Sequence, residues 1–428
     1  MEAQKNSNDV IVKHTPFYYG WVIVIMAALG VFFSGPGQTY SVSIFIDAYI
    51  TEFGWSQSLV SSMYSGATLL SGCLMILLGK MIDRRGQKAM SIVAGVMLTI
   101  ACLFNSFILG PIMLFIGFFL IRMFGQGLME MVPNTLVPQW FVRKRGKAMA
   151  FMEIGGFLSA AALPPLNVWL IASFGWSGAW QVWAAILCLF YIPLIILFVK
   201  NKPEEYGLAP DGPIEKKYKE FSEEINSEIN KVSWPLHQAI RTWSFWGVLF
   251  CIAVPAMVNT GLTFHMVSIL GEEGISRGEA SFVLSMMALV AFPLSFIAGF
   301  VLDRFALHKV FALTLIIETT ALIVLLFADS FASALVFGFL RGVGAGFGTI
   351  CLGLIIPNFF GTGYLGSLKG VGVTSTVIAS SLGPLPFGLA YDWFGGYTEI
   401  LIAMLVFPLL AIFVAWFNKG PDDTKLVR

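Results

Sequence analysis

Apolar residues fill this chain in long blocks that are separated by short polar stretches. A block of about twenty apolar residues can cross the hydrocarbon core of a bilayer as a helix, and only helices and closed barrels satisfy their backbone groups there. The alternation that barrel strands need is missing from these blocks. The pattern predicts an all-α integral membrane protein with twelve transmembrane helices, at about 17–45, 57–79, 88–107, 111–137, 146–172, 176–199, 243–270, 278–300, 309–328, 331–358, 366–392 and 397–418.

One long polar stretch divides the predicted helices into six plus six. It mixes lysines with glutamates, as a solvated linker does. No small-residue cleavage site follows the first apolar block, so we expect a retained helix and not a signal peptide. The predicted organisation is an N-terminal tail (1–16), a six-helix bundle (17–199), a linker (200–242), a second six-helix bundle (243–418) and a C-terminal tail (419–428).

Basic residues gather in alternate loops, and Lys and Arg are retained on the cytoplasmic side of a membrane. The loops after the second and fourth helices are strongly basic, whereas the loops between them hold mostly acidic or neutral residues. We therefore expect both termini and the linker to be cytoplasmic, in a cell membrane. The basic residues of the two loops are Lys80, Arg84, Arg85, Lys88, Arg143, Lys144, Arg145 and Lys147.

The two groups of helices repeat one another. A shift of 220 residues places Gly79, Asp83 and Arg84 on Gly299, Asp303 and Arg304, and a shift of 219 places Arg122 on Arg341. Because six helices is an even number, the two copies have parallel topology, related by an axis along the membrane normal.

The repeated turn GKMIDRRGQK (79–88) has an unusually high density of charged residues. Gly79 and Gly86 allow close approach and a tight turn. Asp83 beside Arg84, and Asp303 beside Arg304, can accept hydrogen bonds from arginines or a helix N-terminus of the other half. We predict that these six residues gate the cytoplasmic side. The alternative is a simple positive-inside anchor, which does not require the duplicated aspartate.

These motifs resemble the major facilitator superfamily over the whole chain: GKMIDRRGQK its loop 2–3 motif, and RMFGQG (122–127) its helix-4 arginine motif. The resemblance implies the major facilitator fold, two pseudo-symmetric six-helix bundles, with a mid-membrane substrate site lined by helices 1, 4, 7 and 10. Further stretches are similar to the bacterial monocarboxylate-porter branch, related to oxalate/formate antiporters. They are FYYGWVIV (17–24), EFGWSQS (52–58), VPQWFVRKRGKAMA (137–150), KPEEYGLAPDG (202–212) and AIRTWSFW (239–246).

Ionisable residues inside membrane helices are costly, so each is a candidate functional residue. Arg122 and Arg341 lie near mid-membrane, where guanidinium groups would attract a carboxylate; alternatively, each bonds backbone carbonyls of its own half. His265 is the one histidine in a predicted membrane helix. It is a candidate for contact with substrate or proton, and the alternative is a structural role. Weaker polar candidates for substrate binding are Tyr40, Gln38, Asn134 and Asn259.

Glu130 and Glu153 are candidates for carrying a coupled proton, because burial favours the neutral form of a carboxyl group. The alternative is a structural hydrogen bond to a neighbouring helix. Glu318 lies in the ninth helix, which we expect to be peripheral, and it is given no role beyond packing against its own half.

The family pattern fails at three positions. Animal monocarboxylate porters carry an Asp and an Arg in helix 8 and a Lys in helix 1, where this chain has Ala291, Ser295 and Tyr40. The usual coupling of a proton to lactate is therefore not implied. Either Arg122 or Arg341 supplies the positive charge, or the substrate is not a small monocarboxylate.

The remaining features narrow the class of function. The net charge is +1, there is no basic tract for nucleic acid, and no GxxxxGK[ST] loop for ATP is present. The five cysteines lie in apolar blocks and are expected to be small buried hydrophobes, not a disulfide or zinc set. Membrane helices without clustered His, Asp or Cys argue against an enzyme or a cofactor, and the linker is too short for a sensor's output domain.

We therefore predict a secondary active transporter that moves a small, monocarboxylate-like organic anion across the cell membrane by alternating access. We expect it to work as a monomer, with proton coupling left open. The alternative is an exporter of an apolar metabolite or drug.

Overall fold

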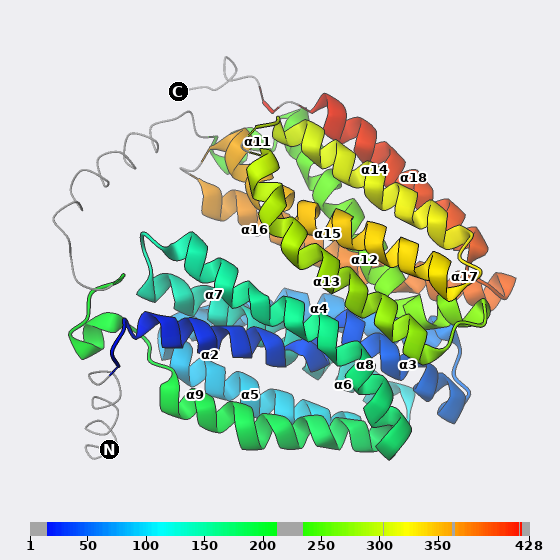
Figure 1. Cartoon of the computed structure of the whole chain (residues 1–428), viewed down its shortest axis with the longest axis horizontal. Helices are drawn as coiled ribbons and strands as arrows, with labels where there is room; N and C mark the ends of the chain where they lie inside the picture. The colour runs from blue at the N-terminus through cyan, green and yellow to red at the C-terminus, as the bar shows by residue number, and fades with distance from the viewer. Residues whose placement is uncertain (1–14, 212–233, 303, 362–363, 419, 422–428) are drawn as a thin grey trace. The chain divides into compact units, whose positions relative to one another are not determined.

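A computed structural model describes residues 15–211, 234–302, 304–361, 364–418 and 420–421 (Figure 1). Within these residues all regular structure is helical, as the sequence predicts. The elements are α2 (Gly20–Phe33), η1 (Gly35–Gly37), α3 (Thr39–Phe53), α4 (Gln57–Arg85), α5 (Gln87–Asn105), α6 (Pro111–Ile121), η2 (Arg122–Leu128), α7 (Met129–Trp140), α8 (Arg145–Ile186), η3 (Leu187–Tyr191), α9 (Ile192–Phe198), η4 (Pro203–Tyr206), α11 (Leu236–Ala239), α12 (Trp243–Glu272), α13 (Arg277–Leu302), α14 (Leu307–Leu326), α15 (Phe331–Phe360), α16 (Leu365–Leu382), α17 (Pro384–Phe394) and α18 (Thr398–Phe417).

Eleven continuous helical stretches of the described chain are long and apolar enough to cross a membrane. One of them, Arg145–Phe198, has 54 residues, which as a straight helix would be about 80 Å long, far more than a bilayer. Gly175 interrupts it with φ 70° and ψ 169°, a conformation that glycine adopts without steric cost. The stretch is therefore two spans joined at Gly175, and the described residues contain the twelve spans that the sequence predicts.

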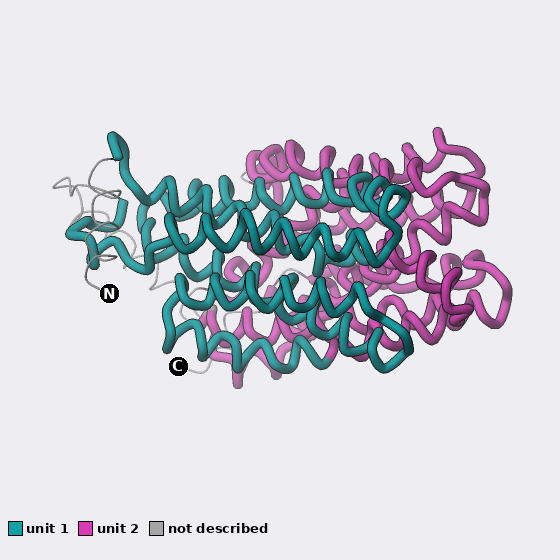
Figure 2. Tube along the Cα trace, turned by 90° about the horizontal axis from the view of Figure 1, so that it is seen from below, with its two compact units in different colours: residues 1–42, 70–216 teal, residues 43–69, 217–428 magenta. Residues whose placement is uncertain are grey.

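The helices pack into two compact units (Figure 2). Unit 1 contains residues 15–42 and 70–211 of the described chain, and unit 2 contains residues 43–69 and the described residues from 234 onward. The division passes through α3 and α4, so the segment 43–69 packs with helices that follow the linker. The two units are defined by which residues pack together. The two six-helix bundles at 17–199 and 243–418 remain a prediction.

Small residues bring helices close together in each unit. In unit 1, a Cβ on Gly155 of α8 would clash with the Ala28 carbonyl of α2, whose carbon would lie 2.7 Å away. In unit 2, a Cβ on Gly342 of α15 would lie 2.6 Å from Val290 Cβ of α13. Such contacts are typical of membrane bundles, where close backbone approach supplies the packing energy.

The expectation that every cysteine is buried is wrong for two of the five. Cys73 and Cys188 are exposed, while Cys102, Cys251 and Cys351 are buried, and all five are free thiols. The exposed pair lies on the surface of apolar helices, where a small apolar side chain suits hydrocarbon as well as it suits a protein core.

Candidate functional site

The first membrane span of unit 1 is broken where its sequence reads GPG. α2 ends at Phe33, and one turn of 3-10 helix, Gly35–Gly37, precedes α3. A Cβ on Gly37 would lie 2.7 Å from the backbone nitrogen of Gln126, so only glycine fits there. The break therefore packs directly on the fourth span.

The fourth span is irregular at the same level. Arg122–Leu128 forms a π-helix between α6 and α7. A Cβ on Gly125 would lie 2.8 Å from the Cα of Gly37. Short π-helical segments occur often at functional sites because they re-aim side chains, and backbone groups freed in a membrane must find partners inside the protein. Two irregular segments in contact thus indicate a site.

Arg122 satisfies part of this freed backbone. Arg122 is 2% exposed, and its Nη1 donates to the Gly37 carbonyl at 3.1 Å and to Thr39 Oγ1 at 3.4 Å. The sequence left two alternatives for Arg122, and one of them was a bond to a backbone carbonyl of its own half. The structure contains such a bond, to Gly37. Contact of Arg122 with substrate stays a prediction.

Three more predicted residues lie at the break. Gln38 Nε2 donates to Glu130 Oε1, and also to Ser34 Oγ at 3.1 Å. The hydroxyl of Tyr40 donates to Ser159 Oγ at 2.9 Å. We call Arg122, Gln38, Glu130 and Tyr40 the N-terminal cluster. It combines a cation, an acid, an amide and a phenol within one unit.

Asn134 and Glu153 are not joined to the cluster's side chains by hydrogen bonds among the described residues. Both are exposed. Asn134 Nδ2 donates to the backbone carbonyl of Glu130 one turn earlier, at 2.9 Å. In unit 2, Asn259 is half-buried on α12.

His265 is fully buried inside unit 2. Its Nε2 lies 3.0 Å from the Pro384 carbonyl and 3.1 Å from Ser61 Oγ, and its Nδ1 lies 3.0 Å from the Tyr397 hydroxyl. A carbonyl can only accept, so Nε2 carries the hydrogen and Nδ1 accepts from Tyr397. These three partners support the structural alternative for His265.

Arg341 is also buried in unit 2, at 2% exposed, but its environment differs from that of Arg122. Nη1 lies 3.5 Å from Glu318 Oε1, while Nε and Nη2 have no acceptor among the described residues. No function for Glu318 was predicted from the sequence. The repeat could have drawn attention to Glu318, because a shift of 220 residues matches it to an apolar residue, Leu98, in the first half.

The proposed gating residues give a mixed result. Gly86 has φ 79°, as the predicted turn requires, and the Lys88 N–H beyond it donates to Asn201 Oδ1 at 2.8 Å. Close approach at Gly79 was expected but is not seen, because a Cβ there would meet only Met131 Sδ at 3.8 Å. The remaining members are Asp83, Arg84 and Arg304, which are exposed, and Asp303, which lies outside the described residues.

The start of the predicted linker belongs to the packing of unit 1. Asp211 accepts hydrogen bonds from the backbone N–H groups of Val142, Arg143 and Lys144, and its own N–H donates to the Trp140 carbonyl. Burial acts to raise the pKa of Asp211, but the three backbone N–H groups outweigh it and hold that pKa below its usual range. The sequence does not predict this contact, because Asp211 lies 69 residues from Val142 along the chain.

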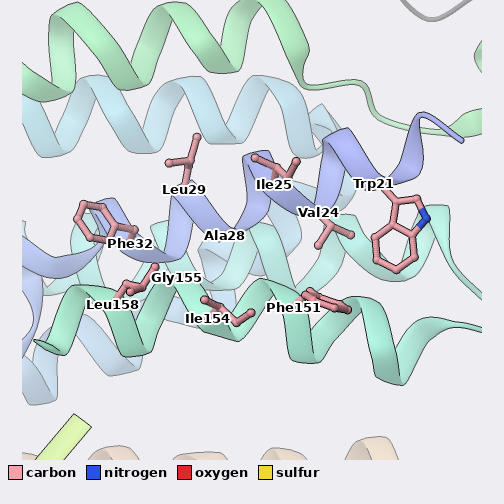
Figure 3. Close-up of a pocket in the computed structure, with 10 residues that line it drawn as sticks. All are labelled: Trp21, Val24, Ile25, Ala28, Leu29, Phe32, Phe151, Ile154, Gly155 and Leu158. Atoms are coloured by element: carbon pink, nitrogen blue, oxygen red, sulfur yellow. The ribbon is translucent and has the colours of Figure 1, made fainter. Parts of the chain in front are cut away.

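Each unit also has an apolar groove. The groove of unit 1 runs between α2 and α8 with a volume of about 400 Å³ (Figure 3). The groove of unit 2 runs between α12 and α16 with about 430 Å³. They are repeats of one another: a shift of 225 places Trp21 and Ala28 on Trp246 and Ala253. The lining of the first is Trp21, Val24, Ile25, Ala28, Leu29, Phe32, Phe151, Ile154, Gly155 and Leu158.

The groove of unit 1 ends beside the N-terminal cluster. Phe32 and Leu158 form part of its lining, and Ser159, the partner of Tyr40, donates to the Phe32 carbonyl at 2.8 Å. An apolar surface thus adjoins a polar cluster that contains a buried cation. In the described part of the chain, no group of three or more His, Cys, Asp or Glu residues could hold a metal ion.

Comparison with known proteins gives consistent results. A family model described as the Major Facilitator Superfamily matches residues 20–272 and 248–428. Monocarboxylate transporter 2 of Mesocricetus auratus is 22% identical over 404 residues, covering 90% of this chain and 81% of that protein. A D-galactonate transporter of Escherichia coli is 25% identical over 263 residues, covering 59% of this chain and 60% of that protein.

Solved structures show the same fold. The D-xylose-proton symporter aligns with a TM-score of 0.72 at 16% identity, over 95% of this chain and 99% of that chain. A bacterial homologue of the human lysosomal transporter Spinster aligns with a TM-score of 0.71 at 15% identity, over 95% of this chain and 98% of that chain.

Proposed function

The chain belongs to the Major Facilitator Superfamily, and from that premise we propose that this multi-pass membrane transporter moves a small organic anion of the monocarboxylate type by alternating access. Such a cycle requires that the ligand bind differently in the two states. The monocarboxylate transporter and D-galactonate transporter among the relatives carry carboxylates by name, which supports the substrate class.

The N-terminal cluster carries the proposal. Broken helices mark substrate sites in secondary transporters because unwound backbone and helix ends supply polar groups at mid-membrane. Here the break at Gly35–Gly37 meets the π-helix that begins at Arg122. We assign the carboxylate to the Arg122 guanidinium, with Gln38 and Tyr40 as hydrogen-bonding partners.

The other predicted site residues have secondary roles in the proposal. Arg341, His265, Asn134 and Asn259 remain candidate substrate contacts, although the three partners of His265 favour a structural role. Glu130, which accepts a hydrogen bond from Gln38 in the cluster, and Glu153 remain candidate proton carriers. The turn 79–88 and its repeat are proposed to gate the cytoplasmic side. The protein is proposed to lie in the cell membrane with both termini cytoplasmic, and to function as a monomer.

Proteoliposome flux tests the proposal. The purified protein is reconstituted and offered labelled L-lactate, pyruvate, D-galactonate, D-glucuronate and benzoate, with and without a pH gradient. Replacing Arg122 with Gln should raise the half-saturation concentration of the transported anion at least tenfold, because a charge-assisted pair is lost. The matched control is Arg241→Gln, which removes an exposed positive charge. Unchanged affinity in Arg122→Gln would refute the assignment.

A second function, export of an apolar metabolite or drug, is favoured by the paired grooves. It predicts that apolar cations such as ethidium, and not carboxylates, raise the melting temperature of the purified protein. Substituting Trp21, which lines the groove of unit 1, with Ala should then weaken transport of ethidium. Flux of carboxylates without any response to ethidium would exclude this function.

A further inference from the structure

The ion pair of Arg341 and Glu318 uses only one of the three nitrogens of the guanidinium. Both side chains belong to unit 2, on α15 and α14, and their exposed fractions are 3% and 11%. A buried guanidinium is costly unless its donors are paired. Glu318 occupies only Nη1, and the buried Nε and Nη2 have no acceptor in the part of the chain that the structure describes.

The two unpaired nitrogens are the ones that bind a carboxylate side-on. Nε and Nη2 point from the same edge of the planar guanidinium, and that edge donates two parallel hydrogen bonds to a carboxylate. Glu318 sits at the other side of the group. Arg341 can therefore hold two carboxylates at once.

The repeat shows that the shared packing does not require an acid at position 318. In unit 2, Glu318 packs on α15 so closely that a Cβ on Gly344 would lie 2.6 Å from Glu318 Cγ. In unit 1, the matching glycine is Gly125, and a Cβ there would lie 3.2 Å from Leu98 Cδ1. An apolar residue fills the same place in the first copy, so Glu318 is an addition confined to the second.

We propose that Glu318 accepts the symported proton when the substrate carboxylate binds the free edge of Arg341, a contact made at a different step of the transport cycle from its contact with Arg122. This inference rests on the proposed function, and it assigns to Glu318 the role that the sequence gave to Glu130 or Glu153. Before binding, the pair is neutral. A second carboxylate would leave one uncompensated negative charge in a dry site, and a proton from water, transferred to a Glu318 carboxylate oxygen, restores neutrality. Release of the anion lets Arg341 and Glu318 re-pair, which expels the proton.

Few other groups can influence Glu318. Among the described residues, Arg341 is the one charged side chain within ion-pair distance of it. On α15 the other titratable group is the Cys351 thiol, and the remaining charged or titratable residues of α14 and of the helices packed on it lie in the first turns of those helices. They are His308 and Lys309 on α14, Glu399 on α18, and Arg277 and Glu279 on α13.

The test separates exchange from proton-driven accumulation. Wild-type protein and Glu318→Gln are reconstituted, and labelled L-lactate, or the panel monocarboxylate that the wild type carries fastest, is measured in counterflow and under an inward proton gradient. Gln mimics the protonated acid, so counterflow should continue while accumulation above equilibrium is lost. Half-saturation in counterflow should rise with pH in wild type and stay constant in the variant.

Matched variants make the result specific. Arg341→Lys keeps the positive charge but not the fork, so the half-saturation concentration should rise about tenfold while coupling persists. Glu399→Gln removes an exposed acid from the neighbouring α18 and should behave as wild type. Accumulation retained in Glu318→Gln, or lost only in Glu130→Gln or Glu153→Gln, would overturn the inference and leave the proposed function standing.

A measurement on the wild type covers the case in which Glu318→Gln does not fold. Carbodiimides react with protonated buried carboxyls, so labelling of Glu318, followed by peptide mass spectrometry, should increase when lactate is added. Labelling that is unchanged or reduced would overturn the inference. If the wild type moved no carboxylate of the panel, the proposed function would fail first, and the inference with it.

Discussion

Removal of the Asp211 carboxylate should destabilise unit 1 measurably. Its oxygens lie 2.9 Å, 2.7 Å and 3.0 Å from the backbone nitrogens of Val142, Arg143 and Lys144, just before α8, and accept hydrogen bonds from all three N–H groups. Asp211 is 9% exposed, so water cannot fully replace it. It also has φ 64°, a left-handed conformation that Asn and Gly tolerate better than Ala.

The size of the effect follows from these contacts. Loss of a capping side chain costs about 0.5–2 kcal/mol, and a hydrogen bond to a charged group contributes about 1.5–3 kcal/mol. Three bonds that share one carboxylate are not additive, so Asp211→Gly should lose about 2–3 kcal/mol. Asp211→Ala should lose about 1 kcal/mol more because of its positive φ. Asp211→Asn keeps one acceptor oxygen and should lose the least.

The pH dependence has a definite sign. The pKa of Asp211 is lower in the folded protein than its usual value, so its contribution is present above the unfolded pKa of about 3.9. It is lost as the pH falls through the folded pKa. The stability difference between wild type and Asp211→Asn should therefore be full at neutral pH and shrink in acid.

Thermal unfolding in detergent, followed by tryptophan fluorescence at several pH values, provides the assay. The control is Glu205→Gln, which removes an exposed acid from the same segment. At about 2–4 °C per kcal/mol, Asp211→Ala should melt well below the control. Equal melting of Asp211→Ala and Asp211→Gly would refute the backbone part of the reasoning, and equal melting of all variants would refute the rest.

Three other substitutions test the packing described above. Gly155→Val should lower the unfolding temperature by at least the 1–3 kcal/mol typical of overpacking, whereas Gly146→Ala, with nothing within 4 Å, should not; equal effects would argue against close contact of α2 and α8. Gly37→Ala should abolish anion flux while the protein still elutes as a single species, because it separates the break from the π-helix; normal flux would remove the break from the site. His265→Gln should lower the melting temperature of the purified protein but leave the half-saturation concentration unchanged, and the reverse result would restore His265 as a substrate contact.

Much of this protein follows from local sequence alone. Apolar block length set the twelve spans, since a bilayer admits only helices of that length from such residues. The repeat paired Arg122 with Arg341. Such features depend on neighbours along the chain, which a sequence displays directly.

Tertiary structure decided which side chains meet. Arg122 and Arg341 are equivalent in the repeat, yet one bonds the Gly37 carbonyl and the other faces Glu318. The contact of Asp211 with residues 142–144, and that of His265 with Ser61, likewise join parts of the chain that are far apart. A hydrogen bond or ion pair depends on distances of a few ångströms between helices, and periodicity along one helix does not specify them.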